Sequence, residues 1–196
     1  MINYGHRMSK DIDLFFSDPQ LIDYVSPTTN DALEGEMGDY LDGHHFKRYV
    51  LPEGKLDFIK GHPITNLAPT ILDFEGRTIF MDSSVEIAAK KIFYRCGEFK
   101  PRDVFDQAAV LLNEGEEDLA EFCLQFPDKA ELALTKTLTM IDDGALELGL
   151  EALDILPAGE GIKKVSHEVV TAFFEKVLDN KPVSSQKLDD SFTPDL

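Results

Sequence analysis

The sequence predicts an α+β fold, with a β-sheet region over residues 1–82 and a helical region over residues 83–178. Three observations favour this fold class. Residues 11–16 alternate along a strand, turn signals separate two further pairs of extended segments, and the hydrophobic period becomes helical from about Asp82. The 196 residues suit one large domain or two small ones, and with 43% hydrophobic residues the chain can bury a core.

The first predicted strand has the sequence Asp-Ile-Asp-Leu-Phe-Phe at residues 11–16. Successive side chains of a strand point to opposite faces, so Asp11 and Asp13 share one face. Two neighbouring carboxylates raise each other's pKa, and a divalent metal removes that cost. Mg²⁺ prefers one or two carboxylates together with phosphate oxygens. The pair indicates either a metal site or an ordinary solvated acidic strand end.

The other predicted strands form two hairpins. Pro-Glu-Gly at residues 52–54 separates the first pair, and Glu-Gly at residues 75–76 separates the second. In the first hairpin Lys55 and Asp57 share one face of their strand. We expect residues 1–81 to form most of a small mixed or antiparallel sheet, from the strand at 11–16 and these segments: 45–51, 55–59, 70–74 and 77–81.

Helical periodicity dominates the second region. Ser83 or Ser84 is expected to cap its first helix, on which Lys91 and Arg95 lie four residues apart and so share a face. Another helix opens at residues 100–103, a short helix is expected at 17–25, and further helices at 116–125, 128–141, 144–154 and 166–178. Residues 179–196 have few apolar side chains, which predicts a disordered tail.

The charge distribution is uneven. The net charge of −18 argues against broad electrostatic binding to nucleic acid. Residues 1–102 carry 12 Lys and Arg against 16 Asp and Glu, whereas residues 103–196 carry 7 against 21. The first part can therefore present a local basic patch to a phosphate-bearing ligand. The second part is expected to be a solvated helical surface or a docking face for a basic partner.

The two cysteines give no disulfide framework or zinc site, which favours a reducing compartment, and we expect a cytoplasmic protein. No apolar run approaches the length of a membrane span, so no membrane partner is expected. The first residues also lack a basic-then-apolar signal sequence.

Several features of interest converge in their order along the chain. Three carboxylates on neighbouring strands, Asp11, Asp13 and Asp57, can hold two metal ions about 4 Å apart for in-line phosphoryl or nucleotidyl transfer. Nearby Lys and Arg side chains would bind a triphosphate and offset the charge of the transition state. Each feature also has a plainer explanation: a solvated hairpin residue for Asp57, a surface stripe for Lys91 and Arg95, and a helix-start pair for Arg102 and Asp103.

Two motifs carry a resemblance to a known family. Residues 4–15, Tyr-Gly-His-Arg-Met-Ser-Lys-Asp-Ile-Asp-Leu-Phe, resemble the signature of the AbiEii/AbiGii-type nucleotidyltransferases, toxins of abortive-infection toxin–antitoxin systems. Residues 86–91, then Arg95, then residues 102–106, Arg-Asp-Val-Phe-Asp, resemble the second signature of that family. The two signatures are in the expected order and together cover roughly residues 4–112.

The resemblance implies a DNA-polymerase-β-like nucleotidyltransferase sheet followed by a helical part, with a nucleoside triphosphate (NTP) as substrate. It also implies a divalent metal, Mg²⁺ or Mn²⁺, on Asp11, Asp13 and Asp57. The implied catalytic residues are Asp11, Asp13, Asp57, Lys91 and Asp103. The implied nucleotide-binding residues are Arg7, Ser9, Lys91, Arg95 and Arg102. Lys91 is preferred to Lys90 by motif spacing, and Asp106 is expected to support the site by bracing Arg102 or Lys91.

One departure from the family pattern bears on activity. Members carry a Gly-Gly or Gly-Ser pair upstream of the Asp-x-Asp, on a turn that holds the triphosphate through backbone N–H groups. The ten residues before Asp11 contain no such pair. The expectation is a shortened chain, a misassigned start or a degraded homologue.

Three functions therefore stay open. The first is an enzyme that moves a nucleotidyl group from an NTP to an RNA end or a protein hydroxyl, with a cognate antitoxin as a possible partner. The second is a catalytically impaired remnant that acts as a binding or interaction module. The third is a metal-dependent hydrolase that uses the same carboxylates but does not need Lys91.

Overall fold

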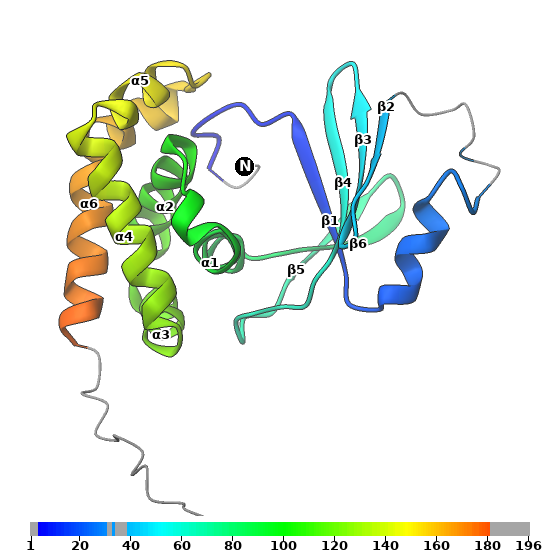
Figure 1. Ribbon diagram of the computed structural model, residues 1–196, viewed down its shortest axis with the longest axis horizontal. Helices are drawn as coiled ribbons and strands as arrows, with labels where there is room; N and C mark the ends of the chain where they lie inside the picture. Colours follow the sequence, from blue (N-terminus) through cyan, green and yellow to red (C-terminus); the bar gives the residue numbers. More distant parts are fainter. Residues whose placement is uncertain (1–3, 31–32, 34–38, 181–196) are drawn as a thin grey trace, which may run out of the picture.

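A computed structural model describes residues 4–30, 33 and 39–180 of the chain. Strands and their connections occupy the N-terminal part, and helices occupy the C-terminal part, so the predicted α+β class is confirmed (Figure 1). Among the described residues no strand follows residue 110; the later part contributes only an isolated bridge between Ile155 and Arg7.

The main sheet is mixed, one of the two arrangements that the sequence left open, and has the strand order β1-β4-β3-β2. Its strands are β1 (Asp11–Phe16), β2 (Asp39–Asp42), β3 (Phe46–Leu51) and β4 (Gly54–Lys60). β1 runs parallel to β4, whereas the other two pairs are antiparallel. The register places Asp13 beside Asp57 and Asp11 beside Lys55, so these four side chains share one face of the sheet.

Gly54 is required where β1 enters the sheet. A Cβ at this position would collide with the backbone carbonyl of Lys10. The residue that ends the β3–β4 turn therefore also lets the parallel edge strand approach β4 closely.

A 3₁₀ helix, η1 (Pro19–Val25), covers the opposite face of the sheet where a short helix was expected. Its N-cap is Asp18, whose carboxylate accepts a hydrogen bond of 2.9 Å from the amide of Gln20. Ile22 is buried, and the hydroxyl of buried Tyr49 donates to the carbonyl of Val25 at 2.6 Å.

The second hairpin forms its own two-stranded sheet, of β5 (Thr70–Phe74) and β6 (Arg77–Met81), and does not extend the main sheet. Its turn has positive φ at Glu75 and Gly76, 51° and 77°. Several of its large apolar side chains are exposed: Ile71, Phe74, Ile79 and Phe80.

The helical part begins where the period changes. Its helices are α1 (Ser84–Arg95), α2 (Pro101–Glu114), α3 (Glu117–Gln125), α4 (Pro127–Asp142), α5 (Ala145–Glu151) and α6 (Glu160–Asp179), with 3₁₀ turns η3 (Cys96–Glu98) and η4 (Pro157–Gly159). Ser83 caps α1 by accepting a hydrogen bond from the amide of Glu86 at 3.0 Å.

Helix boundaries differ from the prediction by a residue at several ends, α5 ends at Glu151 and not at residue 154, and the largest difference is in α6. Helix α6 starts at Glu160 and not at residue 166, because η4 leads directly into it and packing overrides the low helix propensity of Gly161. It also ends at Asp179, one residue inside the segment predicted to be a tail. Asn180 is the C-cap of α6, and residues 181–196 of the predicted tail lie outside the described residues.

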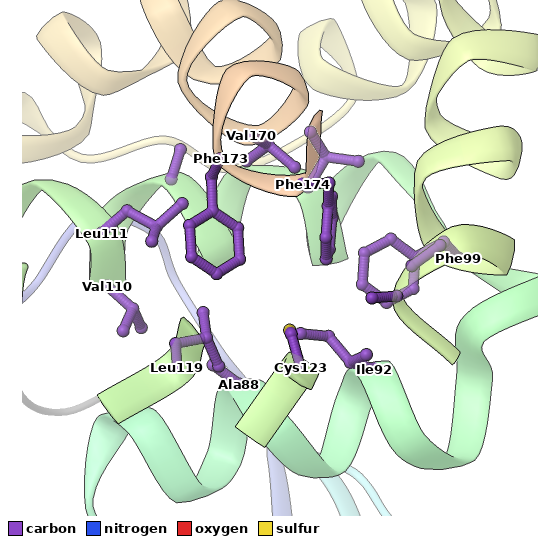
Figure 2. Packing of buried hydrophobic residues seen from close by; sticks show 14 of the residues in the cluster. Ala88, Ile92, Phe99, Val110, Leu111, Leu119, Cys123, Val170, Phe173 and Phe174 are labelled. Carbon is purple, nitrogen blue, oxygen red and sulfur yellow. The ribbon is translucent and has the colours of Figure 1, made fainter. Parts of the chain in front are cut away.

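The main apolar core lies among the helices (Figure 2). Phe173 and Phe174 of α6 are buried against Ala88 and Ile92 of α1 and against Cys123 of α3. This core holds α1 and α2 in fixed positions, and these two helices carry the second predicted motif. Within the ranges described, no helix has the length and apolar character needed to cross a bilayer.

Candidate active site

The sheet contributes a row of charged side chains to the candidate site. Asp13, Asp57 and Arg48 lie on adjacent strands, because the register pairs Asp13 with Asp57 and Asp57 with Arg48. Partial desolvation by the surrounding elements, then the nearby carboxylates of Asp57 and Asp11, raise the pKa of Asp13, while Arg95 and Lys91 oppose that rise. The three predicted strand carboxylates are therefore neighbours, and two cations of α1 lie close enough to act on them.

Asp57 is bound by Arg48 in a bidentate ion pair. The Arg48 Nε donates to Oδ1 of Asp57 at 2.7 Å, and a terminal guanidinium nitrogen donates to Oδ2 at 2.5 Å. The pair raises the pKa of Arg48. Sequence reasoning missed Arg48, although a hairpin across residues 52–54 in this register pairs it with Asp57.

The segment before β1 lies on the helical part (Figure 1). Its backbone is held at both sides of Arg7: the amide of Leu156 donates to the carbonyl of His6 at 3.0 Å, and the amide of Met8 donates to the carbonyl of Asp154 at 2.9 Å. A Cβ on Gly159 would collide with the same His6 carbonyl, so a glycine is needed there. The first signature is thereby fixed against the second.

Asp106 of α2 is the point where the two signatures meet. It receives two hydrogen bonds of 2.7 Å from Arg7, contacts Nε2 of buried His6 at 2.8 Å, and pairs with the Lys91 ammonium. Burial alone would raise its pKa, but Lys91, Arg7 and His6 together hold the pKa of Asp106 far below its usual range. Asp106 thus positions Lys91, as expected, whereas its second cationic partner is Arg7 and not Arg102.

Asp103 is fully buried one turn before Asp106. Its carboxylate accepts from the amide of Lys100 at 3.1 Å, which closes the N-terminus of α2, and from Arg95 at 3.3 Å. Lys91 Nζ lies 3.4 Å away. These contacts make Asp103 an orienting group for two α1 cations, and it is not exposed to a bound substrate.

The remaining predicted residues lie at the rim of the site. A guanidinium nitrogen of Arg102 is 3.9 Å from Oδ2 of Asp11, and so connects α2 directly with β1. The side chains of Arg95 and Arg102 are 39% and 36% exposed, which leaves both partly accessible to an anion. Ser9 is exposed, two residues before Asp11.

The structure distinguishes the two adjacent lysines of α1. Lys90 is buried: its ammonium pairs with Asp82 at 2.6 Å and Glu86 at 3.2 Å, and it lies 3.8 Å from the centre of the Phe15 ring. Lys91 instead points toward the carboxylates of α2. That Lys91 is the site lysine stays a prediction, and the contacts of Lys90 show only that its ammonium is engaged elsewhere.

The oxygen donors fit a hard divalent cation in part. Asp11 and Asp13 offer carboxylates at the accessible end of β1, which suits Mg²⁺ or Mn²⁺. Asp57 has both oxygens engaged by Arg48. Within residues 4–30, 33 and 39–180, no group of three or more His, Cys, Asp or Glu side chains is arranged to hold a metal ion.

A strand with an Asp-x-Asp pair, faced by lysine and arginine side chains from a helical body, is the kind of site used for transfer of phosphate-bearing groups. The family model for the nucleotidyl transferase AbiEii toxin of type IV toxin–antitoxin systems matches residues 1–183. The chain belongs to this family, which confirms the family predicted from the two signatures.

No curated protein matches the chain. Among solved structures, the crystal structure of JHP933 from Helicobacter pylori is similar at 15% sequence identity and a TM-score of 0.39, and the match covers 88% of this chain and 77% of that chain.

Proposed function

We propose that the protein is a metal-dependent nucleotidyltransferase that moves a nucleotidyl group from an NTP to an RNA end or a protein hydroxyl. One observation carries the proposal: Asp11 and Asp13 lie at a site that Lys91, Arg95 and Arg102 also face. These are the residue types that bind a metal–triphosphate complex, brought together from β1, α1 and α2.

Asp11 and Asp13 would hold Mg²⁺ or Mn²⁺ through carboxylate oxygens. The ion supplies Lewis-acid polarisation of the phosphoryl oxygens when bound. Asp57, the third predicted ligand, can contribute an oxygen only if it does so beside, or in place of, its ion pair with Arg48.

The cations of the helical part would bind the phosphates. Lys91 is held by Asp103 and Asp106 at the side of the site, so its ammonium needs little reorganisation to meet developing negative charge. Arg95 and Arg102 are partly exposed and would hold the outer phosphates. In the transfer, the acceptor hydroxyl oxygen forms a bond to the α-phosphorus, the bond to the bridging oxygen breaks, pyrophosphate leaves, and the hydroxyl proton passes to water.

The family also suggests a physiological setting. A cognate antitoxin is a proposed partner because the matched family belongs to toxin–antitoxin systems. The acidic second half of the sequence provides a surface that would suit a basic partner. We place the reaction in the cytoplasm, where NTPs and RNA acceptors are available.

The test uses NTPs labelled at different phosphates. Incubation with α-³²P NTPs, Mg²⁺ and total cellular RNA or protein is expected to label an acceptor, whereas γ-³²P NTPs are not, because pyrophosphate carries the γ label away. Chelation with EDTA and the Asp13→Asn variant should both remove the α label. Label from the γ position would indicate a kinase, release without an acceptor would indicate a hydrolase, and no transfer by a folded protein would support the binding-module alternative.

A further inference from the structure

On the sheet side of the site, Arg48 binds one of the three carboxylates, Asp57, so that only Asp11 and Asp13 remain for a metal ion. Both oxygens of Asp57 accept hydrogen bonds from its guanidinium, at 2.7 and 2.5 Å. The Asp57 side chain is 11% exposed and that of Arg48 is 33% exposed. The pair is therefore partly shielded from solvent, and its bidentate geometry is the strong form of an arginine–carboxylate interaction.

The backbone fixes this pair. Arg48 and Asp57 are opposite each other in the antiparallel β3–β4 ladder, and Asp57 is opposite Asp13 in the parallel β4–β1 ladder. Arg48 also lies 5.4 Å from the centre of the Phe46 ring, two residues earlier on the same face of β3. The register of the β3–β4 ladder therefore keeps the guanidinium beside the Asp57 carboxylate, and Arg48 is part of the site.

The charge of Arg48 acts on the whole carboxylate group. Asp57, Asp11 and Asp13 all stabilise the charged guanidinium, with Asp57 the strongest partner. A divalent ion at Asp57 would have to share its two oxygens with a cation that cannot lose its proton. The positive charges of the ion and of the guanidinium would repel each other across the same carboxylate. Arg48 therefore opposes the binding of an ion at Asp57.

We propose that Arg48 is a positioning residue that serves as the permanent counterion of Asp57 and takes the place of a second divalent ion. The site then holds one ion, on Asp11 and Asp13, and Asp57 is not a ligand. This inference rests on the proposed function, because it concerns the ion that Asp11 and Asp13 would bind.

The test counts Mn²⁺ ions per chain by electron paramagnetic resonance of the free ion. Because the chain has a net charge of −18, non-specific binding is subtracted by comparing each protein with its own version in which Asp11, Asp13 and Asp57 are all replaced by Asn. The wild type is expected to hold one specific ion by this difference, and Arg48→Gln is expected to hold two. Lys55→Gln is the matched control. It also removes a positive charge from this face of the sheet, opposite Asp11, but leaves the ion pair between Arg48 and Asp57 in place. This control should keep a count of one.

The double variant Arg48→Gln, Asp57→Asn covers the case in which Arg48→Gln alone does not fold, because a neutral pair then replaces the charged pair. The double variant is expected to hold one ion, with an affinity for Mn²⁺ within about threefold of the wild type. Loss of a residue that only hydrogen-bonds to a metal ligand typically lowers metal affinity by about 10–100-fold. If Asp57 were itself a ligand, the double variant should therefore lose more than that. Circular dichroism verifies the fold of each variant.

A wild-type count of two that falls to one in Asp57→Asn would overturn the inference and leave the proposed function standing. A count of one in a folded Arg48→Gln protein, or a large loss of affinity in the double variant, would also overturn it. A wild-type count of zero would reject the inference together with the proposed metal dependence.

Discussion

Replacement of Asp106 by asparagine tests the contact between the two signatures. The side chain of Asp106 is 2% exposed, and it neutralises Arg7 and Lys91 while it contacts His6. Asparagine keeps one acceptor oxygen but loses the charge, so two cations remain in a largely buried place without their counterion. Removing one partner from a buried ion pair costs about 3–5 kcal/mol of the free energy of unfolding.

For a chain of this size each kcal/mol corresponds to about 2–4 °C in melting temperature, so Asp106→Asn should lower the Tm by about 6–20 °C at neutral pH. Differential scanning calorimetry measures this shift. Asp142→Asn is the matched control, because Asp142 is an exposed aspartate near the end of α4. A Tm for Asp106→Asn equal to that of the control would refute the central position of Asp106.

The pH dependence gives the same prediction a second, signed readout. The folded-state pKa of Asp106 lies below its ordinary value of 3.8, so its contribution to stability is fully present above that pH and is lost as pH falls through the folded pKa. The gap in Tm between wild type and Asp106→Asn should stay constant from neutral to mildly acidic pH and narrow below about pH 4. A gap that widens on acidification would contradict the assignment.

Three further predictions follow from individual contacts. Lys90→Ala should lower the free energy of unfolding by about 3–5 kcal/mol, because it leaves buried Glu86 and nearby Asp82 without their cation. Lys91→Ala should instead lower the rate of nucleotidyl transfer by about 10²–10³-fold, with a smaller change in Tm because Asp106 keeps its ion pair with Arg7. Equal effects of the two variants on stability and on rate would show that the two lysines do not have distinct roles. Gly159→Ala should cost about 1–3 kcal/mol in a chemical denaturation experiment because its Cβ would meet the His6 carbonyl, whereas Gly97→Ala, which faces open space, should be nearly neutral.

Local patterns predicted the elements of the site better than their connections. The alternation of residues 11–16 placed Asp11 with Asp13, and that of the later strand placed Lys55 with Asp57, because the period of a strand is fixed by its backbone. The parallel pairing of β1 with β4, which brings Asp57 beside Asp13, came from the structure. Helical spacing likewise placed Lys91 and Arg95 together on α1.

The contacts that hold these elements together are long-range, and local patterns do not encode them. His6 and Arg7 reach Asp106 across about 100 positions in sequence, and Met8 is held by a backbone carbonyl of the loop after α5. Arg48 differs from these residues, because the hairpin register that pairs it with Asp57 is local; it belongs to neither acidic motif, and only its cross-strand position marks it as part of the site.

In the proposed function, the carboxylates of β1 and Lys91 of α1 form a single site for nucleotidyl transfer. The most direct measurement is a double-mutant cycle on the rate of α-³²P transfer, with wild type, Asp13→Asn, Lys91→Ala and the double variant. Residues that act as one unit give strongly non-additive losses, so the double variant should be about as slow as the slower single variant. Losses that multiply fully in the double variant, or transfer that neither substitution affects, would contradict a shared site.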